Sequence, residues 1–169
     1  MFQTKLILAV MVAMTLCIMT FADDHKASGK HIVLVKSGEV DDALVNRVKT
    51  FAEQNTALTL KVLPAQSLVE GGLDAQGEAI KKLLADDDLG AVAMVWPEDE
   101  KITNHGVRTS DDRVAVINVR AMKTEDADDE KFARRVERQV MRGIGMLLGL
   151  ETCPNPQCAT TSYPSLDYL

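Results

Sequence analysis

The chain has 169 residues, of which 46% are hydrophobic and 26% are charged. This length suits one domain, and the composition supplies enough apolar side chains for a packed core, which excludes a wholly disordered chain. A formal net charge of −6 argues against a general nucleic-acid binder, and three cysteines are too few for a disulfide-built scaffold.

The first 22 residues have the layout of a secretory signal peptide. Lys5 precedes an apolar run over residues 6–19, and Thr20-Phe21-Ala22 places small residues at the positions that a signal peptidase reads. An uncleaved membrane anchor is the alternative, but the run is short for a full span. We therefore expect cleavage after residue 22 and a periplasmic or extracellular location without a membrane anchor.

The mature chain is expected to begin with a flexible lead-in over residues 23–30, which are polar, and to continue as one domain over residues 31–169. Residues 31–36 form a short apolar run before Ser37-Gly38, which predicts a buried strand. Residues 40–54 carry apolar side chains at helical spacing and predict an amphipathic helix.

A second strand, helix and strand follow in the same order. Residues 58–63 alternate like a strand and stop at Pro64. Residues 78–86 predict a helix after the loosening pair Gly71-Gly72, and residues 91–96 predict a buried strand. The face of this helix is expected to carry Ile80, Leu83 and Leu84.

The last two elements follow a polar stretch over residues 98–112. Residues 114–119 predict a fourth strand, which is expected to be an antiparallel edge because no helix separates it from the third. Residues 129–148 predict a long final helix, and Gly149 stands where helices commonly end. Its apolar stripe consists of Phe132, Val136, Val140, Ile144 and Leu147.

This order of elements predicts an α/β fold. Strands that alternate with helices pair in parallel through right-handed crossovers. We therefore expect a single domain with a mixed, mostly parallel sheet of about four strands, crossover helices and a long C-terminal helix.

The strongest signal is the stretch RQVMRGIGMLLGLETCPNPQC, residues 138–158. It resembles the archaemetzincins, zinc metalloproteases of the metzincin type whose active helix reads HExxHxxGxxH and runs directly into CxxxxC. The resemblance places Gly149, Cys153 and Cys158 on family positions. It implies a metzincin-like fold for the domain, and the order of strands and helices agrees.

On that register the zinc-binding and catalytic residues are replaced. The three histidine positions fall on Arg142, Met146 and Thr152, and the glutamate position falls on Gly143. A guanidinium has no lone pair for a metal, and a thioether suits softer metals than zinc. Glycine has no side chain that takes a proton from water. The resemblance therefore implies a pseudoenzyme that has no catalytic residue, metal or cofactor on this helix.

We expect the altered helix to bind a ligand. Arg138, Arg142 and Met146 share one face at four-residue spacing, and in an archaemetzincin-like fold this face and Thr152 would line the former substrate cleft. Arg142 would supply a positive anchor, either for an acidic group of the protein itself or for a carboxylate of a peptide or ligand. The chain would then be a binding or regulatory module with a peptide or protein partner.

Cys153-Pro-Asn-Pro-Gln-Cys158 is a tight loop with two prolines. In the archaemetzincins this pair joins a downstream cysteine pair to bind a structural zinc, and no further cysteine follows here. In an oxidising compartment we expect a Cys153–Cys158 disulfide, which contributes about 2 kcal/mol on the chain-entropy model.

Two other interpretations stay open. One is a metal-dependent hydrolase or peptidase with a relocated site, for which His105 is the candidate, although the mature histidines show no HxH or HxxxH spacing. The other is an unrelated α/β domain of flavodoxin-like shape in which the cysteine motif is a coincidence. No phosphate-binding glycine loop follows the first strand.

Overall fold

The structure is a computed structural model that describes residues 31–109, 111, 113–161, 163, 165 and 166. The expected signal peptide and lead-in, residues 1–30, lie outside the described residues. Within the described part, no helix has both the length and the apolar character needed to cross a membrane.

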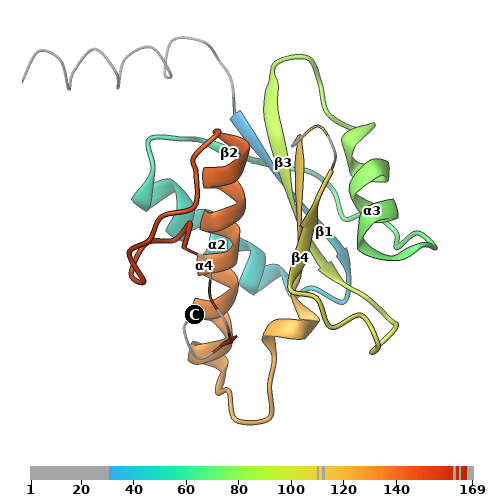
Figure 1. The fold of residues 1–169 in the computed structure, drawn as a ribbon. Helices are drawn as coiled ribbons and strands as arrows, with labels where there is room; N and C mark the ends of the chain where they lie inside the picture. Colours follow the sequence, from blue (N-terminus) through green and yellow to red (C-terminus); the bar gives the residue numbers. More distant parts are fainter. Residues whose placement is uncertain (1–30, 110, 112, 162, 164, 167–169) are drawn as a thin grey trace, which may run out of the picture. The chain divides into compact units, whose positions relative to one another are not determined.

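A five-stranded sheet forms the middle layer (Figure 1). Its strands lie in the order β2-β1-β3-β5-β4. Strands β1, β2, β3 and β5 run parallel, and β4 lies antiparallel to β5 at one edge. The predicted mixed, mostly parallel sheet is therefore confirmed, with one strand more than expected. The strands are β1 (His31–Gly38), β2 (Leu60–Val62), β3 (Asp88–Trp96), β4 (Gly106–Arg108) and β5 (Val114–Asn118).

The central strands are apolar on both faces because helices cover both. Residues 32–35 of β1 and 91–95 of β3 are at most 1% exposed. Continuous apolar runs of this kind are typical of parallel strands with two covered faces. Alternate side chains enter two separate hydrophobic cores, one on each side of the sheet.

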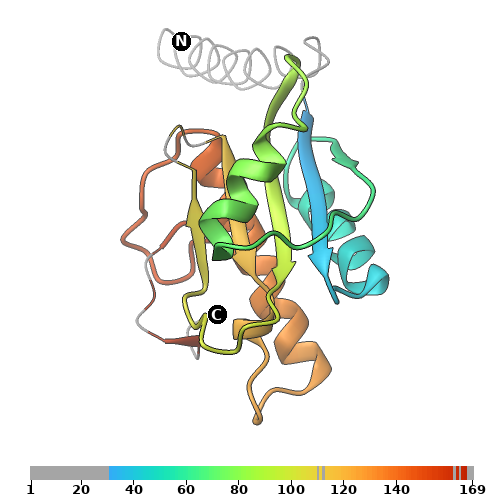
Figure 2. The ribbon, with the colours of Figure 1, turned by 90° about the vertical axis from the view of Figure 1, so that its right-hand side faces the viewer.

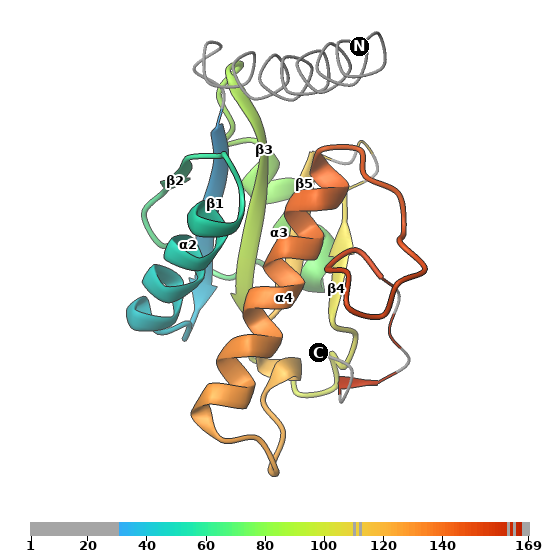
Figure 3. The ribbon, with the colours of Figure 1, turned by 90° about the vertical axis from the view of Figure 1, so that its left-hand side faces the viewer.

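Helices α2 (Asp42–Asn55) and α4 (Asp129–Leu147) cover one face of the sheet (Figure 3). Helix α3 (Gly72–Lys81) covers the other face (Figure 2). The apolar stripe predicted for the final helix is confirmed: its middle residues are buried in the first core, and Phe132 and Leu147 are partly buried at its ends.

The predicted position and direction of the fourth strand in the sheet are wrong. Strand β5 is not an antiparallel edge, because residues 114–118 pair in parallel with β3. The unexpected strand β4 takes the edge position and lies within the stretch predicted to be a polar loop. Only Val107 of its three residues is hydrophobic, so no periodicity revealed it. The chain reverses before and after β4, which lets β5 run parallel to β3 without a crossover helix.

The second predicted helix is also misplaced. Helix α3 begins six residues earlier, at Gly72, and Leu83 lies beyond its end with 45% exposure. Its buried face includes Gln76, which is 1% exposed and bonds to the Ser37 hydroxyl at 3.0 Å and to the Val69 N–H at 2.9 Å. A polar residue on the buried face hid the helical pattern, and these hydrogen bonds make its burial tolerable.

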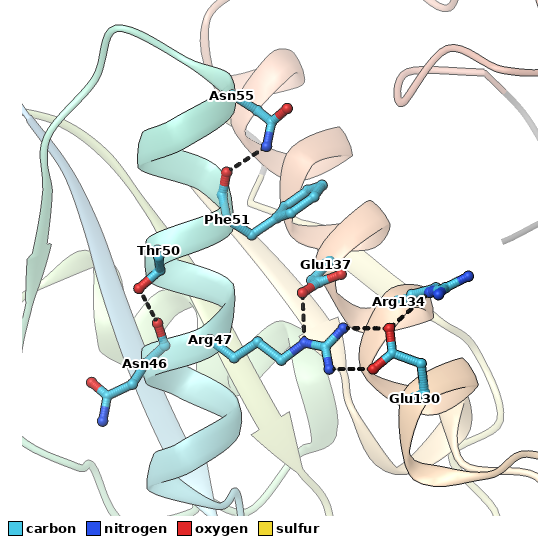
Figure 4. A network of polar contacts seen from close by, with 8 residues as sticks. All are labelled: Asn46, Arg47, Thr50, Phe51, Asn55, Glu130, Arg134 and Glu137. Carbon is cyan, nitrogen blue, oxygen red and sulfur yellow. Dashed lines mark hydrogen bonds and ion pairs between the residues drawn. The ribbon is translucent and has the colours of Figure 1, made fainter.

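Arg47 of α2 joins α2 to α4 through two glutamates (Figure 4). Its Nε donates to Oε1 of Glu137 at 2.7 Å, and its Nη atoms donate to the Glu130 carboxylate at 2.6 and 3.0 Å. The Glu137 side chain is only 9% exposed, so its charge needs this partner. These hydrogen bonds raise the pKa of Arg47, which therefore stays charged.

We expect Arg47→Met to lower the free energy of unfolding by about 2 kcal/mol, because Glu137 loses its cation while Arg47 itself is partly exposed and screened. Urea unfolding followed by circular dichroism measures the change. Arg134→Met is the matched control, since Arg134 contacts Glu130 from the same helix and its side chain is 68% exposed. Equal losses in the two variants would contradict the role given to Arg47.

Three exposed carboxylates hold cations at the surface, and their pKa values are lowered to about 2. The ordinary value is 4.5 for the glutamate and 3.8 for the aspartates. In each case a hydrogen bond from a neighbouring cation is the largest cause. The pairs are Asp111 with Lys81, Asp126 with Lys131, and Glu130 with Arg47.

These shifts predict acid sensitivity. Between about pH 4.5 and about pH 2 the unfolded chain binds protons that the folded chain does not, so stability falls as the pH drops through this window. Urea midpoints measured at a series of pH values check this. The decline should be shallower in Arg47→Met, because Glu130 loses its main partner, and a midpoint independent of pH would count against the assignment.

Candidate functional site

A cleft of about 460 Å³ lies between α4 and the antiparallel edge of the sheet. Helix α4 forms one wall with Gln139, Arg142, Gly143 and Met146. Residues 106–108 of β4 and 115–117 of β5 form the other wall, and the lining is completed by His105 and Tyr163.

The local sequence of α4 sets the depth of this cleft. A Cβ atom at Gly143 would lie 3.1 Å from the Cβ of Ala115, so the glycine lets the helix lie directly on β5. A Cβ at Gly145 would lie 2.7 Å from the Thr160 side chain, so the segment after the helix also packs directly against it. Helix α4 is therefore held closely on two sides.

The end of α4 requires a glycine. Gly149 has a φ of +77°, its N–H donates to the Met146 carbonyl at 3.0 Å, and the Leu150 N–H donates to the Gly145 carbonyl at 2.9 Å. This pair of bonds is the Schellman ending, which favours glycine because other residues strain in the left-handed region. The helix therefore ends at the position that the sequence pattern assigned to it.

Arg142 extends into the cleft and lies over the ring of Tyr163, with 5.4 Å between its Cζ and the ring centroid. Its Nε is buried and has no hydrogen-bond partner among the described residues. The ion pairs formed by the described acidic residues do not include Arg142. The acidic partner within the protein, which was one of the two expectations, is therefore not found in the described part of the chain.

Tyr163 organises the polar side of the cleft. Its ring stacks on His105, with 5.6 Å between centroids and 13° between planes, and its hydroxyl accepts a hydrogen bond from the Gln139 amide. Burial raises the pKa of Tyr163, which keeps the phenol protonated. Burial and the charge of Arg135 lower the pKa of His105, so its imidazole is neutral at neutral pH.

The charged side chains in the described lining of the cleft are cationic. Its described lining contains two arginines, Arg108 and Arg142, and no aspartate or glutamate. This contrasts with the chain as a whole, whose formal net charge is −6. A hollow of this sign attracts anions rather than metal ions.

The four predicted cleft residues do not all share this site. Arg142 and Met146 line the cleft. Arg138 turns away and donates to the carbonyls of Pro156 and Cys158, which fastens the cysteine loop to α4. Thr152 is exposed and is not part of the lining. On a helix of 3.6 residues per turn, each step of four residues rotates the side-chain direction by about 40°. Arg138 and Met146 are two such steps apart, so their side chains point in different directions.

Three of the polar cleft residues were missed by sequence reasoning: Arg108, Gln139 and Tyr163. Gln139 precedes Arg142 by three residues, which places it on the same helix face, and this spacing was the available signal. Arg108 and Tyr163 come from the unexpected edge strand and from the segment after the cysteine loop. No spacing rule links them to α4, because tertiary packing alone brings them there.

Cys153 and Cys158 are half-buried free thiols, so the expected disulfide is not formed in this structure. The pKa of Cys158 is lowered by hydrogen bonds from Thr160 and then by one from Cys153, which makes the two thiols neighbours. Across the described residues, no group of three or more His, Cys, Asp or Glu side chains is placed to hold a metal ion.

The cleft does not fit the zinc ion that the resemblance implies. Arg142 presents only donors, Met146 presents a weak thioether, and Thr152 lies outside the lining. Gly143 leaves no carboxylate to act on a bound water. The chemistry that this cleft supports is the binding of an anion.

No protein-family model and no curated protein matches the chain. Solved structures do match. A zinc-dependent peptidase from Methanocorpusculum labreanum has a TM-score of 0.63 and 16% identity, over 81% of this chain and 91% of that one. The archaemetzincin from Archaeoglobus fulgidus complexed with malonate has a TM-score of 0.60 and 18% identity, over 81% and 89%.

A third structure agrees with these two. The archaemetzincin from Methanopyrus kandleri has a TM-score of 0.62 and 16% identity, over 84% of this chain and 86% of that one. A flavodoxin-like sheet has five parallel strands, whereas β4 is antiparallel here, so that alternative is wrong. The chain has the archaemetzincin-like fold.

Proposed function

We propose that this chain is an exported, catalytically inactive archaemetzincin-like protein that works as a binding or regulatory module. The observation that carries the proposal is the lining of the cleft, in which Arg108 and Arg142 occur with no described acidic residue. Of the two, Arg142 has no carboxylate partner among the described residues, which makes it a suitable anchor for a carboxylate supplied by a ligand.

The ligand is proposed to be a peptide or another molecule with an exposed carboxylate. The planar guanidinium of Arg142 matches the two oxygens of a carboxylate, and the Tyr163 ring beneath it limits its motion. The archaemetzincin from Archaeoglobus fulgidus is complexed with malonate, a small dicarboxylate. By likeness, malonate is a suitable first probe for this cleft.

Export is the second part of the proposal and rests on the signal-peptide layout of residues 1–22. In an oxidising compartment the neighbouring thiols of Cys153 and Cys158 would be joined as a disulfide. That bond would hold the loop which Arg138 already fastens to α4.

We expect the purified protein to retain no stoichiometric zinc after incubation with zinc and desalting, and to leave casein intact. The reason is the replacement of ligands and general base by Arg142, Met146 and Gly143. Metal analysis and a casein digestion assay measure the two properties. Chelator-sensitive cleavage of casein would refute the proposal, and stoichiometric metal would favour the alternative hydrolase with a relocated site near His105.

We expect Arg142→Ala to weaken binding of malonate and of acidic peptides by about tenfold or more, because the charge and the two-pronged geometry are both lost. Isothermal titration with malonate and binding to an acidic-peptide library measure the change. Arg142→Lys keeps the positive charge but loses the planar guanidinium, so its affinity should lie between those of the unaltered protein and Arg142→Ala.

Arg134→Ala is the matched control, since it removes an arginine of the same helix that points to solvent. It should bind like the unaltered protein. If Arg142→Ala, still folded by circular dichroism, binds as well as the unaltered protein, Arg142 is not the anchor.

A further inference from the structure

A second cavity, of about 410 Å³, lies at the carboxyl end of the sheet and shares no lining residue with the cleft described above. Its walls come from the connection between β1 and α2, the end of β3, the segment after β5 and the first turn of α4. Its size falls within the usual range of small-molecule sites, about 300–1,000 Å³.

The topology of the sheet places this cavity where open α/β sheets commonly bind ligands. From β1 the chain goes to β2 on one side, and it then returns to β3 on the other side of β1. Gly38 and Trp96, the last residues of β1 and β3, are paired in the ladder. Crevices outside the carboxyl ends of strands at such a switch point are the general ligand sites of these folds.

The apolar part of the cavity's lining includes two aromatic side chains. Trp96 and Phe132 are partly buried against the main core and are both part of the lining. Trp96 is the only tryptophan of the chain. Two aromatic side chains in one hollow favour an apolar or aromatic group of a ligand.

The rim of the cavity carries unpaired charges of both signs. The ammonium of Lys123 lies over the Phe132 ring, 5.8 Å from its centroid, and enters no ion pair among the described residues. Glu39 and Asp129 are exposed, and the described cations leave them unpaired as well. A ligand with a single negative charge would be repelled by the two carboxylates. A ligand with a single positive charge would be repelled by Lys123.

The remaining charged groups around the cavity are engaged and hold its walls. Arg47 is bound to its two glutamates, and the Asp41 carboxylate accepts from the Ala43 N–H at 2.8 Å. Arg120 donates to the carbonyls of Pro97 and Glu98, which fixes the loop after Trp96. A cavity whose walls are fixed in advance loses little entropy on binding.

We propose that this cavity binds a small dipolar ion with an apolar side group, of the class of free amino acids. Its carboxylate pairs with Lys123, its ammonium pairs with Glu39 or Asp129, and its side group lies against Trp96 and Phe132. The proposal rests on the fold and is independent of the function proposed for the Arg142 cleft.

The fluorescence of Trp96 provides the test, because no other tryptophan contributes to the emission. The protein is titrated with L-phenylalanine, with 3-phenylpropionate, which lacks the ammonium, and with 2-phenylethylamine, which lacks the carboxylate. We expect a saturable change with L-phenylalanine and at least about tenfold weaker binding of both analogues. No saturable change with L-phenylalanine, or equal binding of all three compounds, would overturn the proposal.

Variants separate this site from the other cleft. Lys123→Met should weaken L-phenylalanine binding about tenfold without weakening that of 2-phenylethylamine, which has no carboxylate. Lys101→Met, at an exposed lysine outside the cavity, and Arg142→Ala should both leave the titration unchanged. An unchanged affinity of folded Lys123→Met for L-phenylalanine would refute the amino-acid site. Failure of malonate binding alone would refute only the carboxylate-binding role proposed for the Arg142 cleft.

Discussion

The close contact of α4 with the layers on both sides of it is the constraint on which the site depends. Gly143 allows the helix to lie on β5, and Gly145 allows the segment around Thr160 to lie on the helix. Each glycine weakens a helix by about 0.5–1 kcal/mol relative to alanine, so the packing must offset that loss. Arg142 immediately precedes Gly143 on the helix and lines the cleft, where it lies over the Tyr163 ring.

The arginines of α4 show how the same side chain takes different roles along one helix. Arg134 pairs with Glu130 at the surface, whereas Arg135 is 1% exposed and donates to the Met122 and Leu166 carbonyls. Arg138 fastens the cysteine loop, and Arg142 lies on Tyr163. Of these four arginines, Arg142 is the one whose Nε is buried without a hydrogen-bond partner among the described residues, and this difference makes it the candidate anchor.

The Arg142 cleft and the cavity at the carboxyl end of the sheet have different chemistry because different parts of the fold build them. The Arg142 cleft lies beside the antiparallel edge strand, and the charged side chains of its described lining are arginines. The cavity at the carboxyl end of the sheet is lined by apolar side chains, two of them aromatic, and by charges of both signs. The hydrogen bonds from Arg47 to Glu130 and Glu137 link α2 to α4 beside this second cavity and hold the cavity walls in place.

The amino-acid sequence by itself determined the α/β class, the central buried strands, the apolar stripe of α4 and the turn at Gly149. These follow from local rules: apolar periodicity, strand length and the left-handed conformation of glycine. The sequence also determined that α4 contains no histidine and no cysteine, and that Arg142 offers a metal no lone pair whatever the fold. Only the tertiary structure decided that β4 is the edge strand and that Arg138 bonds to the cysteine loop while Arg142 lines the cleft. It also decided that Tyr163 lines the cleft. Those contacts join residues distant in the chain, and no local periodicity records them.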